Sequence, residues 1–143
     1  MKYNYLCYSL FLIFLALSFL HFYWAFFGNW GFEQALPKNV DGSLVLAPTS
    51  IDSVIVGTAL LFFALFYLFL ASQVIRIPKW INRTFGWLIP IIFLIRAIGD
   101  FRYVGFLKTV DSTSFAQTDY LFYSPLCLLI SILGFMVLKK KGA

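Results

Sequence analysis

The sequence predicts an all-α membrane protein in which four transmembrane helices form an antiparallel bundle. Of its 143 residues, 62% are hydrophobic and only 12% are charged, too little polar surface to cover a water-soluble domain of this size. Apolar runs of about 20 residues, long enough to cross a hydrocarbon core of about 30 Å as a helix, occur four times. We expect a single domain, residues 1–143, with spans at about 5–27, 51–75, 85–106 and 119–138.

The first span also has to be compared with a secretory signal peptide, because Lys2 precedes its apolar run. The apolar region of a signal peptide has about 7 to 15 residues. This run is longer, and no small-residue cleavage site separates it from the loop that follows. We therefore expect it to be retained as a transmembrane helix.

The long connection between the first and second spans, residues 28–50, is predicted to be an outer loop. Its Asp41-Gly42 pair indicates a tight turn, as in a short hairpin. Thr49-Ser50-Ile51-Asp52 fits a capping box that opens the second helix, and Ser114-Phe115-Ala116-Gln117 fits another that opens the fourth.

The distribution of charge predicts that both termini are cytoplasmic, because basic residues flanking short loops are retained on that side. One face of the membrane receives seven basic residues, namely Lys2, Arg76, Lys79, Arg83, Lys139, Lys140 and Lys141. All six acidic residues fall on or toward the other face, namely Glu33, Asp41, Asp52, Asp100, Asp111 and Asp119. We expect membrane lipids as partners and no nucleic acid, which would need a basic patch on a soluble surface.

The two cysteines, Cys7 and Cys127, lie in the first and last spans. They form neither a C-x-x-C pair for thiol exchange nor part of a zinc ligand set. We expect both to be packing residues, and we expect no metal and no cofactor.

Polar residues gather at the outer end of the third span, in the stretch RAIGDFRYVGF at 96–106. If the helix ends near Phe106, Arg96 lies about 15 Å below the outer boundary. An unpaired charge at that depth is costly. Arg96 and Asp100 are four residues apart and share a helix face with Tyr103. We therefore expect Arg96 to face the bundle and to pair with Asp100 or with an acidic residue of another helix.

The other spans bring further polar and aromatic groups to the same depth. His21 and Asp100 each precede the predicted end of their span by the same distance, so they should be level in the membrane, with Trp24 one turn above His21. The fourth span adds an acidic residue and a tyrosine in its outer two turns. The predicted ligand-binding residues are His21, Trp24, Glu33, Arg96, Asp100, Tyr103, Asp119 and Tyr123.

Three stretches of this chain, residues 21–25, 96–106 and 123–126, resemble a bacterial four-span family catalogued as domain of unknown function 3995. The resemblance runs nearly end to end. It implies a small multi-pass protein of the bacterial inner membrane, and it implies no activity, because none is assigned to that family.

Three classes of function fit these observations, and the primary expectation is an accessory or structural membrane protein of unassigned activity. Buried polar residues also hold transmembrane helices together. One alternative is binding or transport of a small amphipathic or lipid-like ligand, with its polar head on Arg96 and Asp100. The other is an isomerase-type intramembrane enzyme that uses His21 with Asp100 or Asp119 as acid and base. A homo-oligomer and a partner membrane subunit both remain open.

Overall fold

The computed structural model describes residues 3–142, so Lys2 of the predicted basic face lies outside the described residues. It contains α1 (Tyr3–Phe26), η1 (Glu33–Ala35), α2 (Ser50–Ser72), α3 (Lys79–Ile98), α4 (Ser114–Thr118), the π-helical turn η2 (Asp119–Tyr123) and α5 (Ser124–Gly142). The helices α1, α2 and α3 and the continuous segment Ser114–Lys140 are each long and apolar enough to cross a membrane. The predicted all-helical architecture with four spans is confirmed, and the chain is a multi-pass membrane protein.

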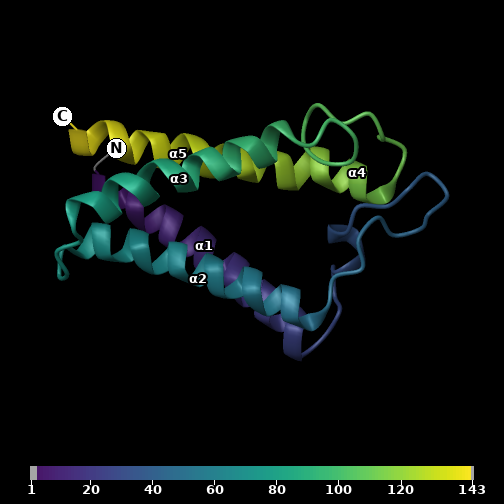
Figure 1. Cartoon of the computed structure of the whole chain (residues 1–143), viewed down its shortest axis with the longest axis horizontal. Coiled ribbons are helices and arrows are strands. Elements are labelled where there is room, and N and C mark those ends of the chain that lie inside the picture. Colours follow the sequence, from purple (N-terminus) through teal and green to yellow (C-terminus); the bar gives the residue numbers. More distant parts are fainter. Residues whose placement is uncertain (1–2, 143) are drawn as a thin grey trace.

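The helices form two pairs that diverge toward one end of the molecule (Figure 1). α1 packs along α2, α3 packs along α5, and contacts between α1 and α5 join the two pairs. The pairs are closest at the end that carries both termini, here called the terminal end. They separate toward the end that carries the connections 27–49 and 99–113, here called the loop end (Figure 1).

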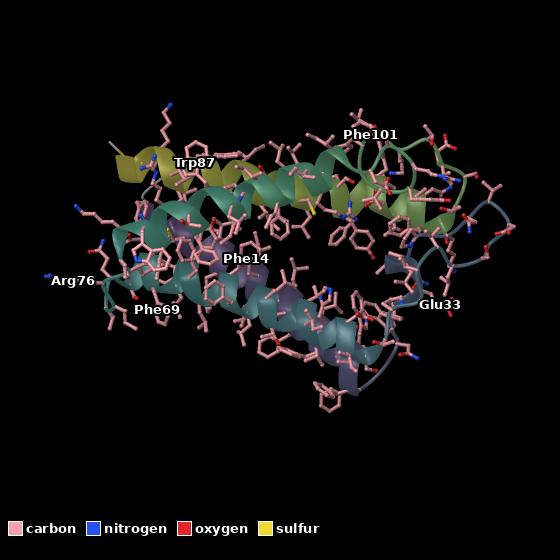
Figure 2. All side chains as sticks on the ribbon, in the orientation of Figure 1. Phe14, Glu33, Phe69, Arg76, Trp87 and Phe101 are labelled. Carbon is pink, nitrogen blue, oxygen red and sulfur yellow. The ribbon has the colours of Figure 1, made fainter. Side chains whose placement is uncertain are left out.

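The core lies where the pairs meet, and Phe14 of α1 is at its centre (Figure 2). Its ring is fully buried, stacks on Tyr67 of α2 at 5.8 Å between centroids, and meets Phe93 of α3 edge-on at 5.2 Å. Aromatic packing of this kind stabilises a bundle beyond the burial of apolar area. It fixes the two pairs to each other at one end and leaves the other end open.

The third helix is shorter than predicted, because α3 ends at Ile98 and not near Phe106. Gly99 has a φ of +99°, which ends the helix and turns the chain back on itself. A Cβ atom on Gly99 would overlap the Val104 carbonyl, and Gly105 also has positive φ. Phe101, Val104 and Phe106 after Gly99 are apolar, so the hydropathy pattern extended the predicted span through this turn.

One of the two predicted capping boxes is confirmed. The backbone N–H of Thr49 donates to Asp52 Oδ2 at 2.7 Å, and the N–H of Asp52 donates to Thr49 Oγ1 at 3.4 Å. The other prediction is wrong by one position, because the residue that caps α4 is Thr113 rather than Ser114. Its hydroxyl accepts from the N–H of Ala116 at 3.1 Å.

The first connection forms the predicted short hairpin and contacts the second connection at the loop end. Lys38 and Leu44 form an isolated antiparallel bridge around the turn. The hydroxyl of Tyr103 donates to Asn39 Oδ1 at 2.7 Å. The two connections are therefore tied together where the helix pairs are furthest apart.

Candidate functional site

A cavity of about 290 Å³ lies between the two helix pairs near the loop end. Its walls come from α1, α2, α3, η2 and α5, and the first connection contributes residues around η1. Most of the lining is apolar, including Leu17, Leu20, Phe32, Leu36, Val56, Leu126, Cys127 and Ile130. The predicted site residues His21, Trp24, Arg96 and Tyr123 also line this cavity, as do Asp52 and Ser53.

Arg96 is anchored at one wall by Asp119, which is fully buried. Arg96 Nη2 donates to Asp119 Oδ1 at 2.8 Å, so the prediction that Arg96 pairs with an acidic residue of another helix is confirmed. The second carboxylate oxygen accepts from Lys108 Nζ at 3.1 Å, from the N–H of Gly105 at 2.8 Å and from Ser124 Oγ at 3.2 Å. Four donors thus satisfy a carboxylate that would be very costly to bury alone.

The π-helical turn places Asp119 at this point. The carbonyl of Asp119 accepts from the N–H of Ser124, five residues on, and the next residue, Pro125, has no N–H to continue the ladder. Single π-helical turns inside α-helices recur at functional sites. Here the turn directs the Asp119 side chain toward α3 and toward the connection that carries Lys108.

Lys108 was missed by the sequence reading. Its side chain is only 4% exposed, and Nζ bonds both the Gly105 carbonyl at 3.0 Å and Asp119. A helix that continued to Phe106 would have placed Lys108 beyond the membrane boundary. The turn at Gly99 instead brings the chain back over the end of α3, and no pattern in the sequence indicates this return.

The resulting cluster carries more positive than negative charge. Arg96 and Lys108 share the single carboxylate of Asp119. A guanidinium has five N–H donors, and Arg96 Nη1 has no hydrogen-bond partner among residues 3–142. About a third of the Arg96 side chain is exposed, and the residue lines the cavity. One wall of the cavity therefore carries a cationic side chain whose unpartnered donor, Nη1, lies buried beneath the cavity surface.

The facing wall is built by α1, with His21 and Trp24 one turn apart. The Nδ1–H of His21 donates to the Leu17 carbonyl at 2.9 Å, and the two rings meet edge-on at 5.0 Å. Trp24 Nε1 donates to the Trp30 carbonyl at 2.8 Å, which ties the first connection to α1. These bonds fix the orientation of both rings toward the cavity.

Gly57 keeps α1 and α2 close together beside this wall. Ser18 Oγ donates to the Gly57 carbonyl at 2.8 Å. A Cβ atom at Gly57 would lie 3.2 Å from the Phe22 ring and 3.3 Å from the His21 Cβ. The wall is therefore a closely packed helix pair, and it is more rigid than a connection would be.

Four of the predicted site residues do not line the cavity, and one of them is Asp119, which lies buried behind Arg96. Asp100 lies beyond the end of α3, exposed, so the helix face that would have joined it to Arg96 does not exist. Glu33 is 77% exposed and pairs with Lys38 at 3.7 Å. Tyr103 bonds to the first connection. The predicted level placement of His21 and Asp100 assumed a helix through Phe106, and α3 ends at Ile98 instead.

Asp100 instead stabilises the turn that follows α3. Its Oδ1 accepts from the N–H groups of Arg102 at 2.9 Å, Tyr103 at 2.7 Å and Val104 at 2.9 Å. Partial burial alone would raise the pKa of Asp100, but these N–H groups, that of Val104 foremost, lower the pKa below its usual range.

A depressed pKa in the folded chain predicts how Asp100 contributes to stability as the pH changes. The ionised carboxylate stabilises the turn above its usual pKa of about 4, and the contribution is lost as the pH falls through the lowered value. We expect Asp100→Asn to lower the thermal unfolding temperature at pH 7, and the gap from the parent to close on acidification. A gap that stays constant between pH 7 and pH 3 would contradict this assignment.

Comparison with known protein families places the chain in one family. The family model described as protein of unknown function (DUF3995) matches residues 14–134, and the match includes all the cavity residues named above. The chain matches no curated protein and no solved structure. Since the matched region covers most of the sequence, the chain belongs to this family of proteins of unknown function.

Proposed function

We propose that the cavity between the helix pairs binds a small amphipathic ligand. The observation that carries this proposal is a guanidinium with one buried, unpartnered donor group, Nη1, at the edge of a mostly apolar cavity of about 290 Å³. Ligand sites in proteins combine apolar walls with a few polar groups that fix orientation. In this arrangement the polar head binds Arg96, and the apolar part lies against Trp24 and Leu126.

The charges favour a head group that is anionic. Two cations share one carboxylate in the cluster on the α3 side. Asp52 also lines the cavity, but its Oδ2 is held by the backbone and hydroxyl of Thr49. A carboxylate or a phosphate accepts well from a guanidinium, so a long-chain carboxylate is a suitable probe.

A structural role for the same cluster is supported by Asp119, whose four donors all belong to the chain itself. The two roles are compatible, because Asp119 faces the protein interior while Arg96 also borders the cavity. An acid–base enzyme has less support. Asp100 does not line the cavity, and Asp119 is held by two cations, so neither carboxylate expected to act with His21 supports this role.

The orientation in the membrane and the compartment are also part of the proposal. The described basic residues of the terminal end favour cytoplasmic termini under the positive-inside rule. The cavity then opens in the outer half of a bacterial inner membrane. A ligand in that leaflet reaches the cavity from the membrane or from the outer aqueous phase.

Fluorescence quenching of Trp24 tests the binding function. A variant with Trp30, Trp80 and Trp87 changed to Phe keeps one tryptophan, and the Trp30 carbonyl that bonds it is unaffected. We expect a bromine-bearing long-chain carboxylate to quench Trp24 saturably. Arg96→Gln should weaken this binding by roughly tenfold or more, since hydrogen bonds to charged groups are strong, and Arg96→Lys should weaken it less.

Arg102→Gln is the matched control, because Arg102 is exposed at the same end and does not line the cavity. Its quenching curve should coincide with that of the parent. Quenching that never saturates, or that is equally strong in the Arg96→Gln variant, would show that the probe partitions into the membrane and does not occupy the cavity.

A further inference from the structure

A second cavity lies at the opposite end of the molecule and has different chemistry. It has a volume of about 830 Å³ and is bordered by the start of α1, the end of α2, the turn into α3 and the end of α5. Its charged lining residues are Arg76, Lys79 and Lys140, and no acidic residue borders it. Apolar residues, including Phe69 and Ile75, complete its walls.

The basic residues of this cavity have no carboxylate side chain near them. All six acidic side chains lie in the connections at the loop end or in the helix turns that adjoin them. Arg76 and Glu33 mark the two ends in Figure 2. Among the described residues, neither Arg76 nor Lys79 makes an ion pair. Acidic side chains of the chain therefore do not neutralise the basic residues at this end.

The backbone adds donors beside these cations. α3 begins at Lys79 after Pro78, whose side chain makes no capping bond. The N–H of Asn82 donates to the Pro78 carbonyl at 3.0 Å, so the N–H groups of the first helical residues before it have no partner within the helix.

We infer that this cavity binds the phosphate of an anionic phospholipid headgroup in the leaflet at the terminal end. Arg76 and Lys79 supply the charge, and the start of α3 supplies backbone donors for phosphate oxygens. The position favours a lipid as the source of the phosphate. The cavity lies where two transmembrane helices end, and its apolar walls can receive the upper part of an acyl chain. Basic pockets between helices at this level bind lipid headgroups.

Native mass spectrometry of the full chain, released from membranes of equal phosphatidylglycerol and phosphatidylcholine, tests the inference. We expect retained phosphatidylglycerol in clear excess over phosphatidylcholine. The double variant Arg76→Gln with Lys79→Gln should reduce that retention by on the order of tenfold, since each basic residue near an anionic surface contributes to binding. Inorganic phosphate at millimolar concentration should not displace the lipid.

The control variant, Arg83→Gln with Lys139→Gln, removes the same charge from the same end at positions that do not line the cavity. It should retain phosphatidylglycerol like the parent. Equal losses in the two double variants would overturn the site in favour of diffuse attraction to the membrane surface. Displacement by inorganic phosphate would overturn the lipid as occupant. If the Arg76 and Lys79 variant does not fold, equal retention of the two lipids by the parent would still refute the inference.

Discussion

Replacing Asp119 with asparagine is expected to lower strongly the yield of folded protein after solubilisation in detergent. The substitution keeps the size of the side chain but leaves Arg96 and Lys108 without the carboxylate that both bind. Breaking a buried ion pair by removing one partner typically costs about 3 to 5 kcal/mol, which is a large part of the stability of a small protein. Size-exclusion chromatography and thermal unfolding in detergent measure the effect.

Asp111→Asn is the control for this prediction, because Asp111 is an exposed acid in the connection that precedes α4. It removes the same charge at a position without these bonds. We expect its yield and unfolding temperature to match those of the parent. If the Asp119 variant also unfolds at the parent's temperature, the ion-pair cluster does not stabilise the bundle.

Gly99→Ala is expected to have an effect of similar size for a steric reason. The new Cβ would overlap the Val104 carbonyl, and backbone shifts cannot relieve this easily because Gly105 also packs against Gly99. Without this turn, the chain cannot bring Gly105 and Lys108 to Asp119. We expect loss of the monodisperse protein, or a large drop in its unfolding temperature.

Gly42→Ala separates the steric effect from backbone strain. Gly42 has a φ of +85°, close to that of Gly99, but a Cβ atom there would meet nothing within 4 Å. Strain alone should cost about 1 to 2 kcal/mol. Similar unfolding temperatures for the two alanine variants would mean that the close approach after α3 is absent in the folded protein.

Hydropathy predicted the four spans because each helix has to present apolar side chains to lipid along its length. It also directed attention to Arg96, since a charge at that depth needs a partner. The partner's identity depended on where α3 ends. Phe101 and Phe106 continue the apolar run after the helix has stopped, so Asp100 was expected on the same helix face as Arg96.

The remaining parts of the site depend on backbone conformation that composition does not encode. The positive φ of Gly99 reverses the chain, and the π-helical turn rotates Asp119 inward. Lys108 reaches the Asp119 carboxylate only because the reversal at Gly99 and the π-helical turn occur in the same structure. The divergence of the two helix pairs likewise depends on how side chains pack around Phe14. It opens the cavity that His21 lines from α1 and Arg96 lines from α3.

Photo-cross-linking in lipid nanodiscs tests the proposed cavity most directly. The probe is a long-chain carboxylate that carries a diazirine near its carboxyl group, and mass spectrometry maps the labelled residues. We predict labelling of Trp24, Leu126 and Cys127, which line the cavity, with competition by excess unlabelled carboxylate and loss of this labelling in Arg96→Gln. Leu121 and Phe122 are exposed outside the cavity. Labelling that is confined to such lipid-facing side chains and is insensitive to competition would contradict a ligand-binding cavity.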